Sequence, residues 1–127
     1  MSQCYCNKKI APDVTFDHLS SILASEMSFE NVSVGKTANI HFDGKCISHT
    51  VTLADKTRKS VGVILPSTLR FDLSTKEVME VVKGTAFVTI NDAPEQTFTD
   101  GQEWVVEAGG FFIIRVEEIL HYVCHFE

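Results

Sequence analysis

A concentration of basic side chains between residues 36 and 59 could attract a small anion. Five lysines and arginines stand there against two aspartates, which leaves the segment with a net charge of +3. For a small ligand this local field matters more than the net charge of the whole chain. In an ideal strand Arg58 and Lys59 point to opposite faces, so only one of them is expected in a pocket. The alternative is that Lys56, Arg58 and Lys59 form a solvated hairpin tip.

Sulfur and imidazole side chains do not have the spacing of a zinc site. The chain contains the four cysteines Cys4, Cys6, Cys46 and Cys124. Only the first two lie close together, and without a secretory signal we expect all four to be free thiols. For the first pair, metal binding or oxidation is the alternative to an unstructured tail. His121 and His125 share one face of a predicted strand, but no third metal ligand lies at close spacing.

Length, composition and charge restrict the class of protein. The chain has 127 residues, of which 44% are apolar, and a net charge of −6. One domain is expected, because single cores are commonest at about 100–150 residues. No apolar run approaches the roughly 18 residues of a membrane span, and the N-terminus lacks the apolar core of a secretory signal, so we expect a cytoplasmic protein with no membrane partner. The acidic total disfavours binding to nucleic acid polymers.

The predicted secondary structure that must position these groups changes from helix to strand near residue 27. Within residues 1–26, apolar residues recur at helical spacing after a proline and an aspartate, which predicts an N-terminal extension that is helical; a disordered tail is the alternative. Over residues 27–127, apolar and polar residues alternate and turn signals separate the runs. This pattern predicts an all-β domain, either a sandwich or a barrel.

Turn residues predict how neighbouring strands connect. Asp43-Gly44 is a two-residue hairpin signal that leads into a return strand over residues 45–53. One face of this strand carries His49 among apolar residues, so we expect His49 to be a hydrogen-bonded core residue with a minor role in binding. Gly84 predicts a second hairpin, in which the strands before and after the glycine pair with each other.

The run from Glu77 to Gly84 resembles the end of the first cupin motif, in which six residues separate a glutamate from a glycine. Other segments follow in the order found in the small single-domain cupins called pyrimidine/purine nucleoside phosphorylases. These segments are residues 29–34, 38–45, 58–66, 77–84, 103–104, 107–109 and 122–126. The resemblance implies a single cupin jelly-roll barrel over residues 27–127.

The activity that the resemblance implies is phosphate-dependent cleavage of purine and pyrimidine nucleosides to free base and ribose 1-phosphate. Such an enzyme is a pentosyltransferase whose partners are nucleosides and inorganic phosphate. The resemblance further implies a homodimer that uses no metal and no cofactor, with phosphate as co-substrate. Metal-binding cupins carry a His-x-His pair shortly before the glutamate, and the corresponding positions here hold Arg70 and Asp72, or Phe71 and Leu73.

The resemblance also indicates which side chains act in such a reaction. If Glu77 faces the barrel interior as its cupin counterpart does, Met79 does so too. Glu77 could then orient ribose hydroxyls or stabilise a cationic sugar, with a structural carboxylate as an equal alternative. Arg58 is the first choice for phosphate, because a guanidinium binds phosphate through two hydrogen bonds, and Arg70 is the competing cation.

Aromatic and thioether surfaces can hold a nucleobase without strict reading of its edges. Phe71 and Tyr122 are the candidates for stacking on the base or the ribose, and ordinary core packing is the alternative. Met79 and His49 complete the predicted substrate-binding set.

One departure from the family pattern concerns the mouth of the barrel. After Gly110 the pattern continues with a strand and a turn, but here Phe111 follows directly, so about nine residues are absent and strand edges would be unpaired. Either a segment is omitted from the sequence or a deletion has removed it. A deletion would favour a second hypothesis, a non-catalytic cupin that binds a nucleoside or a small anion. A third, a metal-dependent oxygenase or isomerase, is disfavoured by the missing histidines.

Overall fold

The computed structural model describes residues 27–127. The predicted extension over residues 1–26, its helix, and the thiols of Cys4 and Cys6 lie outside the described residues. Contacts divide the chain after Asn31, and the unit described below comprises residues 32–127. Within the described part, no helix has the length and the apolar character needed to cross a membrane.

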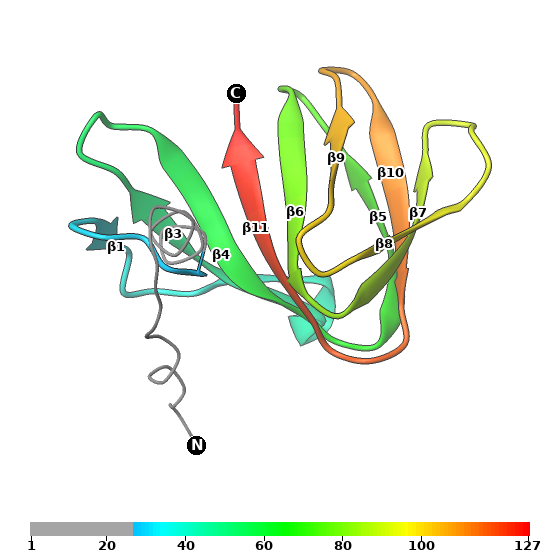
Figure 1. The fold of residues 1–127 in the computed structure, drawn as a ribbon, viewed down its shortest axis with the longest axis horizontal. Helices are drawn as coiled ribbons and strands as arrows, with labels where there is room; N and C mark the ends of the chain where they lie inside the picture. Colours follow the sequence, from blue (N-terminus) through cyan, green and yellow to red (C-terminus); the bar gives the residue numbers. More distant parts are fainter. Residues whose placement is uncertain (1–26) are drawn as a thin grey trace, which may run out of the picture. The chain divides into compact units, whose positions relative to one another are not determined.

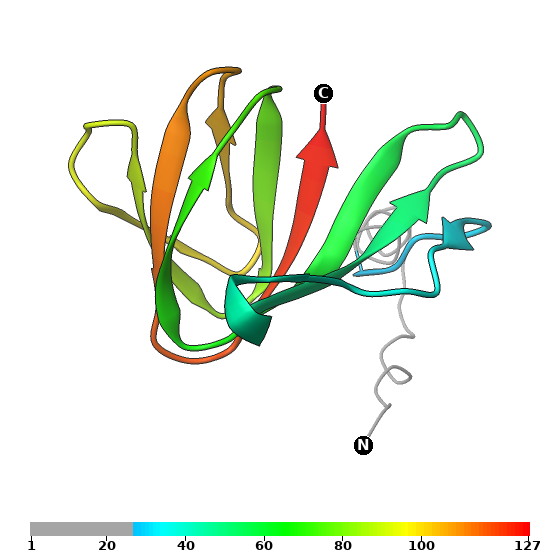
Figure 2. The same ribbon diagram turned by 180° about the vertical axis from the view of Figure 1, so that it is seen from behind.

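The alternating segments form strands that assemble into two sheets (Figure 1; Figure 2). The first sheet has seven strands in the order β1-β3-β4-β11-β6-β9, with β2 paired to β3 beside this path; the second has four in the order β5-β10-β7-β8. The strands are β1 (Ser33–Val34), β2 (Asn39–His41), β3 (Cys46–Thr52), β4 (Arg58–Ile64), β5 (Ser67–Asp72), β6 (Glu77–Lys83), β7 (Thr85–Ile90), β8 (Gln96–Thr99), β9 (Glu103–Val106), β10 (Phe111–Val116) and β11 (Leu120–Phe126). A 3-10 turn, η2 (Phe42–Gly44), joins β2 to β3. The prediction of an all-β fold is confirmed.

The core lies between the two sheets. On β10 the side chains of Phe112, Ile114 and Val116 are buried, whereas those between them are partly exposed. Strands of both sheets contribute the other buried apolar side chains, which include Ile64, Leu69, Met79, Val81, Ala86, Val88, Trp104, Val106 and Leu120. Removal of this apolar surface from water is the main force that holds the sheets together.

Gly84 does not close a hairpin, and the predicted pairing of the strands on its two sides is wrong. β6 pairs with β9 and β11, while β7 pairs with β8 and β10, so the chain passes from one sheet to the other at this glycine. Gly84 has a φ of +117°, which glycine adopts at little cost. Its N–H donates to Asp100 Oδ1 at 2.7 Å. The turn at Gly84 is present, but the strands before and after it, β6 and β7, pair with other strands and not with each other.

β3 turns its polar face, and not its apolar face, toward the interior. Ser48 is only 4% exposed, whereas His49 lies on the opposite face and its Nδ1 donates to the carbonyl oxygen of Gly35 at 2.9 Å. The expectation that His49 belongs to a core-facing side is therefore wrong, because the interior at this point is a polar pocket. Gly62 lets β4 approach closely here, since a Cβ on it would lie 2.7 Å from the Cα of Ser48.

The chain is continuous and paired at the point where the sequence predicts a missing segment. β9 leads through a turn at residues 107–110 into β10, which pairs with β5 along one edge and with β7 along the other. The turn is fixed by two backbone hydrogen bonds, from Gly109 N–H to Leu73 O at 2.8 Å and from Leu73 N–H to Gly110 O at 3.0 Å. The unpaired edge expected from a deletion does not exist at β10.

Candidate functional site

The register of the seven-stranded sheet places Arg58 and Glu77 on the same inner face. Cys124 on β11 lies opposite Ser60 on β4, and Phe126 lies opposite Glu77 on β6. Side chains directly opposite each other share a face, as do residues two apart on one strand. Arg58 and Phe126, two residues from Ser60 and Cys124, therefore belong to the same inward-facing set as Glu77.

Two adjoining pockets open on this inner face. The inner pocket has a volume of about 160 Å³ and is lined by His41, Cys46, Ser48, Ser60, Phe71, Glu77, Met79, Phe112, Tyr122, Cys124 and Phe126. The outer pocket has about 260 Å³ and is lined by Asn39, His41, Ser48, Thr50, Arg58, Ser60 and Phe126. The volume of each pocket is below the range of about 300–1,000 Å³ that is typical of a small-molecule site. Because they share four lining residues, we treat them as one candidate site.

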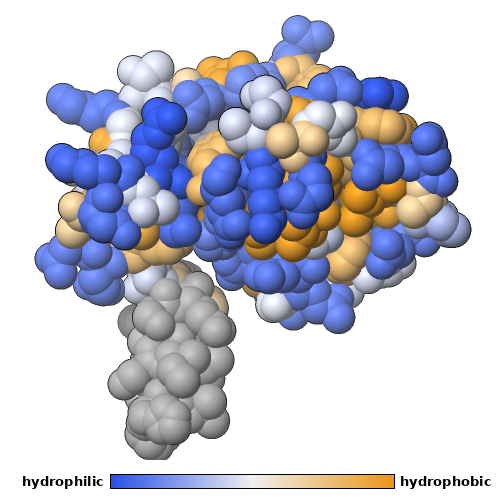
Figure 3. Space-filling view, turned by 90° about the horizontal axis from the view of Figure 1, so that it is seen from above, coloured by the Kyte–Doolittle hydropathy of each residue, from blue (hydrophilic) through white to orange (hydrophobic). Residues whose placement is uncertain are grey.

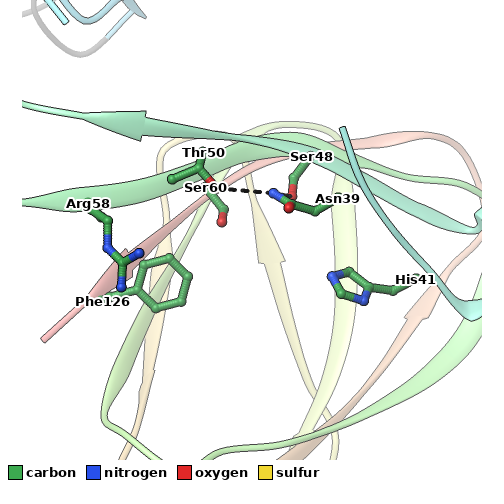
Figure 4. A pocket seen from close by; sticks show the side chains of 7 residues that line it. All are labelled: Asn39, His41, Ser48, Thr50, Arg58, Ser60 and Phe126. Carbon is green, nitrogen blue, oxygen red and sulfur yellow. Dashed lines mark hydrogen bonds between the residues drawn. The ribbon is translucent and has the colours of Figure 1, made fainter. Parts of the chain in front are cut away.

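Polar groups surround the outer pocket (Figure 4). Arg58 lies beside the ring of Phe126 at one side, and His41 points inward from the other side. Asn39 Nδ2 donates to Thr50 Oγ1 at 3.1 Å, which fixes the amide between β2 and β3. Within residues 27–127 no carboxylate forms an ion pair with Arg58, so its guanidinium is available to an anion.

Glu77 places a carboxylate in the inner pocket. The thiol of Cys124 donates to Glu77 Oε1 at 3.3 Å. Burial raises the pKa of the Glu77 carboxyl, while the hydrogen bond from Cys124 lowers that pKa by stabilising the ionised form. Burial and the neighbouring Glu77 raise the pKa of the Cys124 thiol, so this thiol stays protonated and acts as a donor.

A second hydrogen-bonded pair lies deeper in the inner pocket. The Cys46 thiol and the Tyr122 hydroxyl are 3.3 Å apart and share a hydrogen bond. Burial raises the pKa of both groups, so both keep their protons near neutral pH. They can hold a polar ligand by hydrogen bonds, but they are poor proton donors to a reacting group.

Aromatic rings form one wall of the inner pocket. Phe71 and Phe112 are stacked with their ring centroids 5.0 Å apart, and Phe42 meets Phe71 edge-on at 5.1 Å. Met79 adds a thioether to the same pocket. A flat ligand such as a nucleobase can stack on such a surface without strict hydrogen-bond requirements.

The structure brings together five of the seven predicted site residues. Arg58 lines the outer pocket, and Glu77, Phe71, Met79 and Tyr122 line the inner one. The predicted interior orientation of Glu77 and Met79 is confirmed; the roles assigned to these residues stay predictions.

Arg70 and His49, the two remaining predicted residues, do not line either pocket. Arg70 pairs with Asp72 at 3.0 Å and lies over the ring of Phe111, with its Cζ 3.9 Å from the ring centroid. Strand alternation is the reason, because the inward positions on β5 belong to the residues before and after Arg70. His49 points outward from β3 for the same reason.

Sequence reasoning missed His41, Asn39, Ser60 and Phe126. The signal for the first two was present in the hairpin, because its register pairs His41 with Cys46 and Asn39 with Ser48. Once the polar face of β3 is known to be the inner one, this pairing puts both side chains in the pocket.

A polar cluster of Lys59, His125 and Glu80 lies on the opposite, outer face of the same strands. Lys59 Nζ donates to His125 Nδ1 at 2.8 Å, and the other ring nitrogen, Nε2, donates to Glu80 Oε1 at 2.9 Å. The cluster crosses β4, β11 and β6, the three strands that also carry Arg58, Cys124 and Glu77. The prediction that Arg58 and Lys59 point to opposite faces is confirmed.

A third hollow, of about 530 Å³, lies at the far ends of the strands. Asp100, Glu117 and Glu118 line it together with one lysine, Lys83, and the net negative charge opposes binding of an anion. The candidate site lies toward the other end, where β6 begins and β11 finishes. Figure 3 looks onto that end, and hydrophilic side chains predominate there on the β3–β4 side.

The pocket of this all-β fold has the Arg58 guanidinium at its outer part and the Glu77 carboxylate farther in. This arrangement defines a small-molecule site suited to a ligand with anionic and hydroxyl groups. The chain belongs to the pyrimidine/purine nucleoside phosphorylase family, whose sequence profile matches residues 36–126.

Individual relatives and solved structures agree with this assignment. A pyrimidine/purine nucleoside phosphorylase of Laribacter hongkongensis (strain HLHK9) is 57% identical over 99 residues, which are 77% of this chain and 96% of that protein. Its counterpart in Nocardia farcinica (strain IFM 10152) is 53% identical over 100 residues. The crystal structure of a DUF1255 protein of unknown function from Acinetobacter sp. ADP1 is similar with a TM-score of 0.78 at 41% identity, covering 80% of this chain and 99% of that one.

The same comparison corrects the expectation about Gly110. An alignment of 99 residues that spans 96% of the Laribacter protein leaves no room for a nine-residue segment present there and absent here. The relatives and the paired β10 agree that nothing is missing before Phe111. The pocket mouth therefore lacks the damage that would have favoured a non-catalytic protein.

Proposed function

We propose that this protein cleaves purine and pyrimidine nucleosides with inorganic phosphate and releases the free base and ribose 1-phosphate. The observation that carries the proposal is the placement of Arg58 and Glu77 on one inner face, at the outer and inner parts of a shared pocket. This pentosyl transfer needs a held phosphate, a stabilised cationic sugar and a bound base, and no cofactor. It is a reaction for a pentosyltransferase in the cytoplasm.

The described groups suit these three needs. The Arg58 guanidinium can bind two phosphate oxygens at once. The Glu77 carboxylate lies deeper, where burial strengthens its interaction with a positive sugar ring. The Phe71 ring, stacked on the buried Phe112, offers one surface to either class of base, which fits a site that accepts both purines and pyrimidines.

The test is to incubate purified protein with uridine or adenosine, with and without phosphate, and to quantify free base and ribose 1-phosphate. We expect both products in equal amounts and only with phosphate. Base release without phosphate would indicate a hydrolase, and binding without release would indicate a non-catalytic nucleoside-binding protein. Iron or zinc bound in stoichiometric amount, measured by elemental analysis, would contradict a reaction that uses no metal.

We also propose that the protein is a homodimer whose second copy covers the outer face of the seven-stranded sheet. The apolar residues of that face, by register, are Val34, Ile40, Ile47, Val51, Val61, Val63, Val78, Val105 and Val123. Of these residues Val34, Ile40 and Val105 are exposed, at 56%, 64% and 43%, whereas Val51, Val78 and Val123 are buried. Exposed apolar side chains gathered on one sheet face are typical of an interface. Sedimentation of Ile40→Glu should show monomers where the unmodified protein shows dimers; a monomeric unmodified protein would contradict the proposal.

A further inference from the structure

We propose that His41 is the general acid that protonates the departing base, an inference that rests on the proposed function. His41 lines both pockets and so lies where they meet. Its imidazole points into the outer pocket from β2, across from Arg58 (Figure 4). Neither ring nitrogen has a hydrogen-bond partner among residues 27–127, so either nitrogen can reach a ligand.

The reaction requires an acid in this place. When the bond between C1′ and the base nitrogen breaks, its electron pair stays on the base, and a proton delivered to the base lowers the barrier. The aromatic wall of Phe71 and Phe112 positions a base in the inner pocket, and His41 lies at the border of that pocket.

The other titratable or charged groups that line the two pockets are less suited to this step. They are Cys46 on β3, Arg58 on β4, Glu77 on β6, and Tyr122 and Cys124 on β11. Burial makes both thiols and the phenol weak acids, and a guanidinium does not release its proton. The carboxylate of Glu77 already accepts a hydrogen bond from Cys124. Histidine is the side chain that ordinarily gains and loses a proton near neutral pH.

The step balances with the groups named. An oxygen of hydrogen phosphate, held by Arg58, forms a bond to C1′ while the bond from C1′ to the base nitrogen breaks. The electron pair of the broken bond goes to the base, and the proton of the His41 imidazolium follows it. The proton that hydrogen phosphate loses on forming the ester returns to His41 through water. The nucleoside and hydrogen phosphate thus become free base and ribose 1-phosphate.

The test compares leaving groups that do and do not need a proton, in the unmodified protein and in His41→Gln. Inosine and uridine need one, whereas nicotinamide riboside carries a positive pyridinium and releases a neutral base. Because general acid catalysis contributes about 10²–10⁴-fold, we expect His41→Gln to lower kcat for inosine and uridine by at least about 100-fold. Phosphorolysis of nicotinamide riboside should be affected far less. A fraction of misfolded variant would lower both rates equally and would not imitate this difference.

His121→Gln is the matched control, because His121 lines the hollow at the far end of the strands and not the candidate site. It should leave both rates unchanged. An equal loss for all three nucleosides in His41→Gln, or no loss for any, would overturn the role of His41 while the proposed function stands. An unmodified protein that cleaves none of the three with phosphate would overturn the proposed function, and the inference with it.

Discussion

Replacement of Arg58 by alanine should weaken the use of phosphate while leaving the fold intact. Arg58 is the first residue of β4, is exposed, and has no ion-pair partner among residues 27–127. Its side chain lines the outer pocket only. Its removal therefore costs few contacts within the protein, and its effect should concentrate on the bound anion.

The size of the effect follows from the bond that is lost. A hydrogen bond to a charged group contributes about 1.5–3 kcal/mol. At about 1.4 kcal/mol for each factor of ten, the loss of one such bond corresponds to an increase of about 10- to 150-fold in the KM for phosphate, and the loss of both bonds of the guanidinium should give at least this increase. Arg58→Lys keeps the charge but loses the fork geometry, so it should fall between the unmodified protein and Arg58→Ala.

The assay is initial-rate base release at saturating nucleoside over a range of phosphate concentrations. Lys59→Ala is the matched control, because Lys59 follows Arg58 directly in β4 and is also a cation, but points to the outer face, where it bonds to His125. Its KM for phosphate should not change. The reasoning is refuted if Arg58→Ala keeps the unmodified KM for phosphate, or if Lys59→Ala raises it equally.

Three further predictions concern the surroundings of the site. Cys124→Ala removes the hydrogen bond that lowers the pKa of Glu77, so the pKa of Glu77 should rise. If the reaction requires the ionised carboxylate, the acidic limb of the pH profile of kcat/KM should move to higher pH. An unmoved limb would show that ionisation of Glu77 does not control the rate. Gly62→Ala forces a methyl group against the neighbouring strand and should lower the free energy of unfolding, measured in urea, by about 1–3 kcal/mol. Gly35→Ala is the control and should change this free energy little, because the nearest contact of its new Cβ is at 3.6 Å. Equal effects of the two substitutions would argue against close packing at Gly62. Arg70→Ala should leave both KM values unchanged, because Arg70 faces away from the pocket, and a raised phosphate KM would restore it as the competing cation.

The alternation of apolar and polar residues along the sequence was sufficient to predict the strands and the orientation of several side chains. Glu77 and Met79 face the pocket together because they are two residues apart on one strand, and Arg58 and Lys59 separate because they are adjacent. These orientations follow from the two-residue period of a strand once one residue of the strand is known to face inward. For β6 the resemblance to a cupin motif assigned that face correctly.

Features that depend on distant partners could not be predicted in this way. Gly84 marks a turn whether the following strand pairs back or joins the other sheet, and only the pairing of β7 with β10 decides between them. The face of β3 was misjudged because apolar residues were expected inside. The interior at this point is a pocket with polar lining, and Ser48 is buried there. His41 was missed for the same reason, since its orientation follows from that of β3.

The Lys59–His125–Glu80 cluster has a consequence for the integrity of the site. Since side chains alternate, a shift of one strand by a single residue exchanges its two faces. Such a shift of β4 would bring the Lys59 ammonium group to the position of the Arg58 guanidinium. A shift of β11 would replace the Cys124 thiol with the His125 imidazole. The outer hydrogen bonds, 2.8 and 2.9 Å long, are satisfied only when the three strands are aligned as found. These bonds add to the backbone pairing that aligns the strands, so a side-chain substitution leaves the register in place. A deletion of one residue within β4 shifts that register, and it should disable the pocket even in a chain that still forms both sheets.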